Sequence, residues 1–322
     1  MDKMQKFNDL ISIVMPVFNV QEYISLSLFS VMRQTYNRIE IIIVDDGSTD
    51  ESIKIAERIV TGDDRVRIIR QENKGLGMAR NIGLENALGE WVFFLDSDDT
   101  ISLNTLESMI KTGIKFDSDF VFSDYEMVTE QVSCDVITNT EPYDVDTDKL
   151  LIDFLTRKTV LIAPGTLYRK DFLIRNDLFF FPIPWSEDQH FLWRVLSKSR
   201  KVSYVKGAFY HYLVREKSIM VSTENYKKIE SYHYFDELVK SESIRHPIVK
   251  KFLLARWVLG TLNSSAKSGT YSDWKTLYRQ LDAKNKCKIL YKFPHVKTRF
   301  LAFCLRYFPK LYWRAFGLKK TC

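Results

Sequence analysis

The sequence predicts an α/β fold with a mainly parallel sheet, followed by a mostly helical C-terminal region. Through the first 125 residues, short apolar runs alternate with amphipathic segments, and beyond about residue 225 nearly all of the chain reads as helix. Strands that alternate with helices of about 10–15 residues are typical of right-handed βαβ units. The chain has 322 residues, 45% of them apolar, which is ample for a buried core and excludes a disordered or collagen-like protein.

Five apolar runs, rich in β-branched or aromatic residues and bounded by turn residues, are the expected strands of the first half. They are Ile11–Val17, Ile39–Val44, Val66–Arg70, Trp91–Leu95 and Phe120–Tyr125.

Helix signals lie between these strands. Asn19 stands three residues before Glu22, and Ser48 three before Glu51, which is the spacing of a capping box at a helix start. Leu76–Ala87 is the third expected helix.

From about residue 150 helix and strand signals are mixed. Leu150–Thr156 and Asp188–Leu196 are expected helices, whereas Val160–Tyr168, Val202–Val205 and Ala208–Leu213 are expected strands.

Polar residues follow each expected strand of the first hundred residues. In open parallel sheets, ligands bind at the carboxyl ends of strands, so these side chains are expected at one edge. The alternative is that they are ordinary turn residues. The segments concerned are Phe18-Asn19, Asp45-Asp46-Gly47-Ser48, Gln71-Glu72-Asn73 and Asp96-Ser97-Asp98-Asp99.

Two carboxylates, Asp96 and Asp98, follow the apolar run that ends at Leu95. Carboxylate oxygens suit a hard divalent cation, Mg²⁺ or Mn²⁺, whose coordination the oxygens of a diphosphate would complete. Charge neutralisation by the cation makes a diphosphate a better leaving group.

Four motifs together resemble the family 2 glycosyltransferases with the GT-A fold, of the bacterial capsule and exopolysaccharide type. They are PVFN (16–19), VDDGSTD (44–50), NKGLGMARNIGL (73–84) and FLDSDD (94–99), and their order and spacing match over about the first 100 residues. The resemblance implies transfer of a hexose or N-acetylhexosamine from a nucleotide-sugar, usually a UDP-sugar, with inversion at the anomeric carbon.

The resemblance also implies roles for residues of the first half. Pro16, Phe18 and Asn19 match the base-binding loop. Asp46 matches the acid that accepts a hydrogen bond from a uracil N–H, which a carboxylate can do. Asn73 and Arg80 match positions lining the nucleotide; the plain alternative for Arg80 is a cation on a helix surface.

The acidic motif after the fourth strand matches the metal and sugar side of the family's site. Asp96 corresponds to an acid near both the ribose and the metal, and Asp98 to the direct metal ligand. Ser97 is grouped with the nucleotide-sugar contacts. Asp99 fits the pattern as well, or caps the following helix.

Glu187-Asp188 at an expected helix start resembles the family's ED motif, which makes Asp188 the candidate general base. Direct displacement needs a base opposite the leaving diphosphate, and a carboxylate beside an apolar wall serves well. The alternative is a helix N-terminal acid, which the helix dipole also favours. Both roles are compatible.

The segment 209–218 resembles the part of the family that closes over the diphosphate. Arg215, Lys217 and Ser218 are expected to bind phosphate oxygens. His211 is a candidate third metal ligand, with a packed structural histidine as the alternative.

The charge is divided unevenly. Residues 286–322, the basic tail, hold ten Lys or Arg and no Asp or Glu. The net charge of the whole chain is +6, so residues 1–285 carry a net charge of −4. Arg299, Arg306, Lys310 and Arg314 share one helical face beside many aromatics, with a break expected at Pro309. This pattern favours contact with an anionic membrane surface. The alternative is helices that pack on the catalytic domain. No nucleic-acid-binding motif accompanies the charge.

We therefore expect a GT-A catalytic domain over 1–220, divided into a nucleotide-binding half (1–100) and an acceptor half (101–220). A helical extension (221–285) and the basic tail (286–322) follow. The four cysteines have no metal-site spacing, and no signal peptide or membrane span is expected. These features suggest a cytoplasmic enzyme on the inner face of the cytoplasmic membrane.

The expected reaction is inverting transfer from a UDP-sugar to a hydroxyl of a glycan carried on a polyprenyl diphosphate lipid, in surface polysaccharide synthesis. Alternatives are an enzyme that glycosylates a wall polymer or protein, a sugar nucleotidyltransferase and a non-catalytic assembly subunit. A nucleotidyltransferase would need a Gly-rich loop where PVFN stands. The presence of both Asp98 and Asp188, the candidate metal ligand and general base, argues against a non-catalytic subunit.

Overall fold

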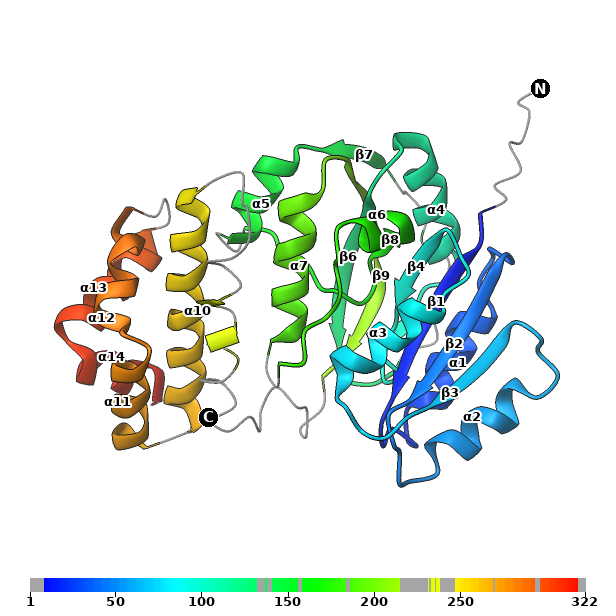
Figure 1. Ribbon diagram of the computed structural model, residues 1–322, viewed down its shortest axis with the longest axis horizontal. Coiled ribbons are helices and arrows are strands. Elements are labelled where there is room, and N and C mark those ends of the chain that lie inside the picture. Colours follow the sequence, from blue (N-terminus) through cyan, green and yellow to red (C-terminus); the bar gives the residue numbers. More distant parts are fainter. Residues whose placement is uncertain are drawn as a thin grey trace. The chain divides into compact units, whose positions relative to one another are not determined.

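The computed structural model describes residues 9–131, 137, 141–155, 158–183, 186–214, 231, 233–234, 236–237, 247–268, 270–292 and 296–317 (Figure 1). The chain forms two compact units. The first consists of Met1–Leu150, Leu161–Pro182 and Glu187–Ser218, and the second of Leu151–Val160, Ile183–Ser186 and Ile219–Cys322.

The first unit is built on one mixed sheet with the strand order β3-β2-β1-β4-β8-β6-β9-β5. Its first four strands are parallel: β3 (Val66–Arg70), β2 (Ile39–Asp45), β1 (Ile11–Val17) and β4 (Trp91–Phe94). These are the predicted strands, and every residue of β1 and β2 is buried, because helices cover both faces of the sheet.

The other half of the sheet is mostly antiparallel. β8 (Leu167–Arg169) runs antiparallel to β4 and to β6 (Phe120–Val128), and β6 pairs in parallel with β9 (Val202–Leu213). β5 (Thr100–Ile101) and β7 (Pro142–Val145) both pair antiparallel with β9. The long strand β9 thus connects the segment after β4 to the rest of the second half.

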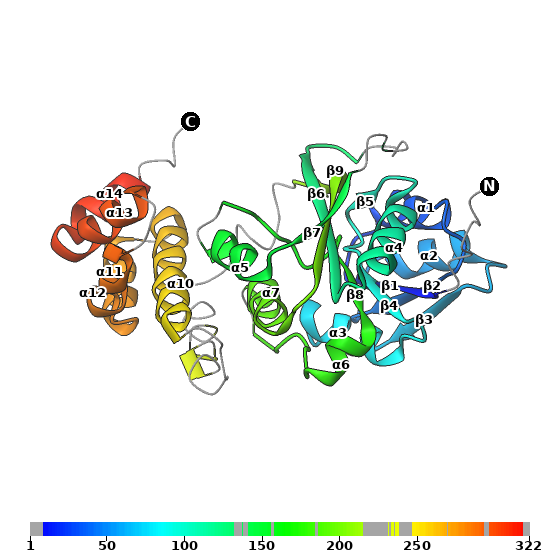
Figure 2. The same cartoon turned by 90° about the horizontal axis from the view of Figure 1, so that it is seen from above.

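Helices cover the two faces of this sheet (Figure 2). On one face lie α1 (Ile24–Met32), α2 (Ser52–Val60) and α4 (Thr105–Phe116), whose apolar side chains share a core with alternate residues of β1. On the other lie α3 (Leu76–Asn86), α6 (Lys170–Arg175) and α7 (Glu187–Lys198). The helix α5 (Thr147–Leu155) follows β7.

Three predicted local features differ from the structure. Neither expected capping box forms, since α1 and α2 begin at Ile24 and Ser52 without a side-chain cap. The expected strand Val160–Tyr168 is mostly irregular, with a turn at Gly165, whose φ is +74°, and only its last two residues belong to β8. The two expected strands after residue 200 are one strand, β9, with an irregularity opposite β6.

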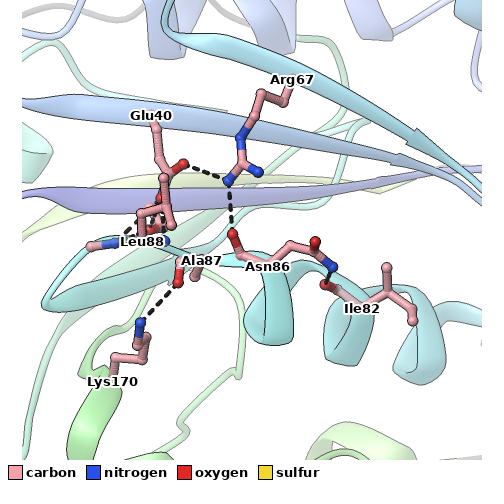
Figure 3. A network of polar contacts seen from close by, with 9 residues as sticks. Glu40, Arg67, Ile82, Asn86, Ala87, Leu88 and Lys170 are labelled. Atoms are coloured by element: carbon pink, nitrogen blue, oxygen red, sulfur yellow. Dashed lines mark hydrogen bonds and ion pairs between the residues drawn. The ribbon is translucent and has the colours of Figure 1, made fainter.

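A buried carboxylate fixes the turn that leads into β4 (Figure 3). Glu40 accepts hydrogen bonds from the Ser12 hydroxyl (2.5 Å), the Leu88 N–H (2.6 Å) and the Arg67 guanidinium (2.7 Å). Burial alone would raise the pKa of Glu40, but these donors outweigh it and hold the pKa below its ordinary value. Lys170 secures the same turn by donating to the Ala87 carbonyl (2.8 Å).

From residue 247 onward, the described part of the second unit is helical. It comprises α10 (Pro247–Ser268), α11 (Tyr271–Gln280), α12 (Ala283–Lys286), the 3₁₀ helix η1 (Cys287–Lys292), α13 (Val296–Tyr307) and α14 (Pro309–Gly317). The break before Pro309 is as predicted, because proline lacks the N–H that would continue α13.

Residues of the basic tail belong to the core of this second unit. Leu290, Ala302, Leu305 and Tyr312 are buried in one cluster with α10 and α11. The cluster contains residues on both sides of residue 285, and the first unit ends at Ser218. The division of the chain into a catalytic domain, a helical extension and a tail stays a prediction. Among the described residues, no helix has the length and hydrophobicity to cross a membrane.

Candidate active site

The loops after β1 and β2 are tied together by Asn19. Its backbone is left-handed, with a φ of +51°, a conformation that asparagine tolerates better than most residues. Its Oδ1 accepts hydrogen bonds from the N–H groups of Thr49 (2.9 Å) and Asp50 (3.3 Å). The side chain expected to cap a helix therefore shapes the loop that resembles the family's base-binding loop.

Asp46 ties the next loop to the same edge. One carboxylate oxygen accepts from the Gln71 amide (2.7 Å) and the Lys74 N–H (2.8 Å), and the other accepts from the Gly75 N–H (2.9 Å). Asp46 is buried, so these bonds hold the loop between β3 and α3 firmly. Its role toward a nucleobase stays a prediction.

Arg80 is a buried bridge between two acidic segments far apart in the sequence. Its Nη2 donates to Asp96 at 2.6 Å and its Nη1 to Glu187 at 3.2 Å, and its guanidinium lies 5.1 Å from the ring centroid of Phe180. The side chain is 2% exposed, so it is not the surface cation weighed as the alternative. The nucleotide contact expected from the resemblance stays untested, but the ion pairs join the acids after β4 to the start of α7.

The helix α3 holds the segment that enters α7. Asn81 donates its amide to the Phe180 carbonyl (2.7 Å) and accepts from the Phe180 N–H (2.8 Å). Gly77 lies so close that a Cβ there would be 3.1 Å from the Cβ of Phe180 and 3.3 Å from the Cγ of Glu187. Residues of the motif NKGLGMARNIGL therefore also position the segment that carries the predicted general base, Asp188.

The carboxyl groups at the start of α7 have raised pKa values. Burial, and then the negative charge of Asp188, raise the pKa of Glu187 to about 7, against the opposing charge of Arg80. Burial likewise raises the pKa of Asp188, while Arg80 and the hydrogen bond from the Gln189 N–H (2.7 Å) oppose the rise. A carboxylate with a raised pKa is a stronger base than an ordinary aspartate, which suits proton abstraction near neutral pH.

The acids after β4 have different surroundings. Asp96 is paired with Arg80, whereas Asp98 is partly exposed and Ser97 is buried. No cluster of three or more His, Cys, Asp or Glu forms a metal site within the described ranges. Two neighbouring carboxylates nevertheless fit Mg²⁺ or Mn²⁺, which commonly takes one or two protein carboxylates together with substrate phosphates.

Asp99 does not cap the following helix. It is buried and accepts the Tyr210 hydroxyl (2.5 Å) and the Leu213 N–H (2.7 Å), both from β9. Burial, followed by the charges of Asp98 and Asp96, raises the pKa of Asp99 to about 8. Asp99 therefore attaches the acidic loop to β9.

His211 is buried in β9 with both ring nitrogens engaged. Nε2 lies 3.0 Å from the Ser102 hydroxyl and Nδ1 lies 2.5 Å from Glu126 Oε1. This arrangement matches the structural alternative. Binding of a metal by His211, which stays a prediction, would require one of these contacts to break.

The remaining predicted residues lie in varied positions. Phe18 is 45% exposed at the carboxyl end of β1, as a side chain that meets a planar base would be, whereas Pro16 is buried within β1. Asn73 is exposed in the loop before α3. Outside the described residues lie the expected phosphate-binding residues, Arg215, Lys217 and Ser218.

Four residues that matter to this geometry were not selected from the sequence as site residues: Glu187, Asn81, Tyr210 and Glu126. Glu187 was visible as half of the ED motif. The other three have partners far away in the sequence and gave no local signal.

Comparison with known proteins agrees with this architecture. The model of the family described as Glycosyl transferase family 2 matches residues 12–173, half of the chain. EpsH of Bacillus subtilis is 36% identical over 216 residues, which are 65% of this chain and 62% of EpsH. The glycosyltransferase GlyA of Streptococcus pneumoniae is 29% identical over 87% of this chain, but the match spans only 41% of GlyA.

Two further similar proteins have a substrate in their name or a bound ligand in their crystal structure. A UDP-Glc:alpha-D-GlcNAc-diphosphoundecaprenol beta-1,3-glucosyltransferase, WfgD of Escherichia coli, is 28% identical over 78% of this chain and 92% of its own length. The crystal structure of S. aureus TarS residues 1–349 in complex with UDP-GlcNAc has a TM-score of 0.70 at 20% identity, covering 96% of this chain and 91% of that one. At this identity the structural match establishes the fold.

Proposed function

Because the chain belongs to glycosyl transferase family 2, we propose that it is an inverting glycosyltransferase that uses a UDP-sugar. The observation that carries the proposal is the Arg80 bridge, which connects Asp96, on the expected donor side, to the Glu187–Asp188 pair, on the expected acceptor side. A donor site and a base must be adjacent for direct displacement.

In the proposed reaction, Asp188 takes the proton of the acceptor hydroxyl. The hydroxyl oxygen forms a bond to the anomeric carbon as the bond from that carbon to the diphosphate oxygen breaks, and UDP leaves with the electron pair. Attack from the side opposite UDP inverts the configuration. The raised pKa of Asp188 favours its role as proton acceptor.

Asp98, with Asp96 beside it, would hold a divalent cation. When bound, the cation neutralises charge on the leaving diphosphate. A similar fold occurs in the mannosyltransferase PcManGT of Pyrobaculum calidifontis in complex with GDP-Man and Mn²⁺, with a TM-score of 0.56 at 14% identity.

The test is a panel of UDP-sugars with Mn²⁺ or Mg²⁺, followed by NMR of the product anomer. Asp188→Asn should lower kcat by about 10²–10⁴-fold while UDP still binds. Asp171→Asn makes the same chemical change at an exposed carboxylate on α6, so it serves as the control and should retain most activity. Undiminished turnover by Asp188→Asn would remove Asp188 as the base, and retention of configuration would refute the inverting mechanism.

The proposed acceptor is a glycan on a lipid diphosphate, in polysaccharide synthesis at the inner face of the cytoplasmic membrane. Two observations support it: the name of WfgD includes such an acceptor, and the basic tail has ten cations without an acid. We therefore also propose that the tail contacts an anionic membrane surface. Co-sedimentation of the full chain with anionic vesicles, lost in high salt, tests this contact.

A further inference from the structure

The helix α13 has a second apolar face in addition to the one in the core. Ala302 and Leu305 are buried, whereas Val296, Phe300 and Tyr307 are 68%, 63% and 57% exposed. Together with Phe303, these exposed residues recur at spacings of four, three and four, so they form one stripe along the helix, here called the α13 stripe. The core of the second unit leaves this stripe uncovered.

The stripe continues past the end of α13. Phe308 and Leu311 are also exposed, at 52% and 60%. A group of exposed aromatic and aliphatic side chains usually marks a binding surface. Aromatic side chains with flanking cations are typical of helices that lie in a membrane interface.

Arg306 lies beside the stripe and has an incomplete set of partners. Its Nε and Nη1 are buried and have no hydrogen-bond acceptor, and its guanidinium lies 5.6 Å from the ring centroid of Tyr307. A buried guanidinium donor without an acceptor is costly, so such a group favours an incoming anion. No acidic residue occurs in the basic tail to supply one.

Tyr291, in η1, offers a further polar atom near this arginine. Its hydroxyl is buried and has no hydrogen-bond partner. The 3₁₀ helix η1 packs against α13, which carries Arg306. Burial and then the neighbouring Tyr307 raise the pKa of Tyr291, and the positive charge of Arg306 opposes the rise. A guanidinium and a phenol hydroxyl together provide donors for several oxygens of one phosphate.

We propose that Arg306 and Tyr291 bind the phosphate of an anionic membrane lipid while the α13 stripe enters the interface. This inference rests on the membrane contact proposed above and names its contact point. The occupant is a lipid because the site combines phosphate donors with an exposed apolar stripe. A free phosphate ion has no apolar part that could contact the α13 stripe.

The experiment compares matched charge-removing variants of the full chain on phosphatidylcholine vesicles with and without phosphatidylglycerol. Arg306→Gln should weaken binding by about 10- to 100-fold, as expected for a charge-assisted hydrogen bond. Arg314→Gln removes an exposed cation from α14 and should cost only about fivefold. Tyr291→Phe should cost about 2- to 10-fold.

A second readout separates a binding role from a structural one. Because the buried guanidinium donors have no partner, Arg306→Gln should leave the Tm unchanged or raise it. A fall in Tm together with equal binding losses in Arg306→Gln and Arg314→Gln would overturn the site. Thermal stabilisation by inorganic phosphate alone, without vesicle binding, would overturn the lipid assignment, as would RNA binding that is equally sensitive to Arg306.

The outcomes also distinguish this inference from the proposal on which it rests. If the wild-type chain does not bind anionic vesicles, the membrane contact itself is wrong. If it binds them and Arg306→Gln behaves like Arg314→Gln, the membrane contact stands and the specific phosphate site fails. Phe300→Ser on the stripe should weaken binding to vesicles but leave the response to salt unchanged.

Discussion

Replacement of Arg80 by methionine should destabilise the first unit strongly. The change keeps a long side chain but removes the cation shared by Asp96 and Glu187, which lie 2.6 Å and 3.2 Å from the guanidinium nitrogens. Breaking a buried ion pair by removal of one partner costs about 3–5 kcal/mol, because the remaining charge stays buried. For a unit of this size, that loss corresponds to a Tm lower by roughly 6–20 °C.

Differential scanning calorimetry measures the change, with Arg175→Met as the matched control. Arg175 pairs with Asp171 at a similar distance, 2.8 Å, but both side chains are 68% exposed. An exposed pair contributes at most about 1 kcal/mol, so the control should barely move the transition.

At a pH above the raised pKa of Glu187, the double variant Arg80→Met with Glu187→Gln removes one of the two carboxylates that have lost their cation. It should recover part of the stability lost in Arg80→Met, because the partners are coupled. A fall in Tm of less than about 2 °C in Arg80→Met, the range of a surface substitution, would refute the argument that the bridge holds α7 to α3 and β4.

Three further changes test other parts of the first unit. The free energy of unfolding should fall as the pH rises from 4.5 to about 7, because folded Glu187 keeps a proton that the unfolded chain releases over this range. Urea unfolding of Glu187→Gln should show a weaker dependence of this free energy on pH. An unchanged dependence would contradict the raised pKa of Glu187. Gly83→Ala would place a Cβ 2.1 Å from a Val14 methyl and should lower the free energy of unfolding by about 1–3 kcal/mol. Val14→Ala in the same chain should restore part of this stability, whereas additive losses in the double variant would argue against the contact. Asp98→Ala should remove the dependence of UDP binding on Mn²⁺ in calorimetric titration, and wild-type binding that is unchanged in EDTA would exclude the metal role.

Some of the site was predictable because its signals are local. β1 to β4 are apolar runs that end in turn residues, so their positions and their polar ends could be predicted before any contact was known. Glu187-Asp188 was recognisable because it resembles the family's ED motif and stands at the start of an amphipathic helix, α7.

Other features depend on partners distant in the sequence. The capping-box spacing at Asn19 was misleading, since Asn19 bonds the loop after β2 instead of its own helix. The expected strand over Val160–Tyr168 has a suitable composition, but Gly165 turns the chain there and a Cβ would be 2.5 Å from the ring of Tyr210. The amino-acid composition of the segment cannot predict this contact, because Tyr210 is distant in the sequence.

The sequence by itself determined the parallel strand run, the acids at its edge and the helical, basic C-terminal region, because hydrophobic spacing and turn chemistry act over a few residues. Tertiary structure decided which groups meet: Arg80 between Asp96 and Glu187, His211 between Ser102 and Glu126, and α13 with one apolar face inside the core and one outside. The physical reason is that burial, pKa and ion pairing depend on what the folded chain brings alongside a residue. The sequence alone records only its neighbours along the chain.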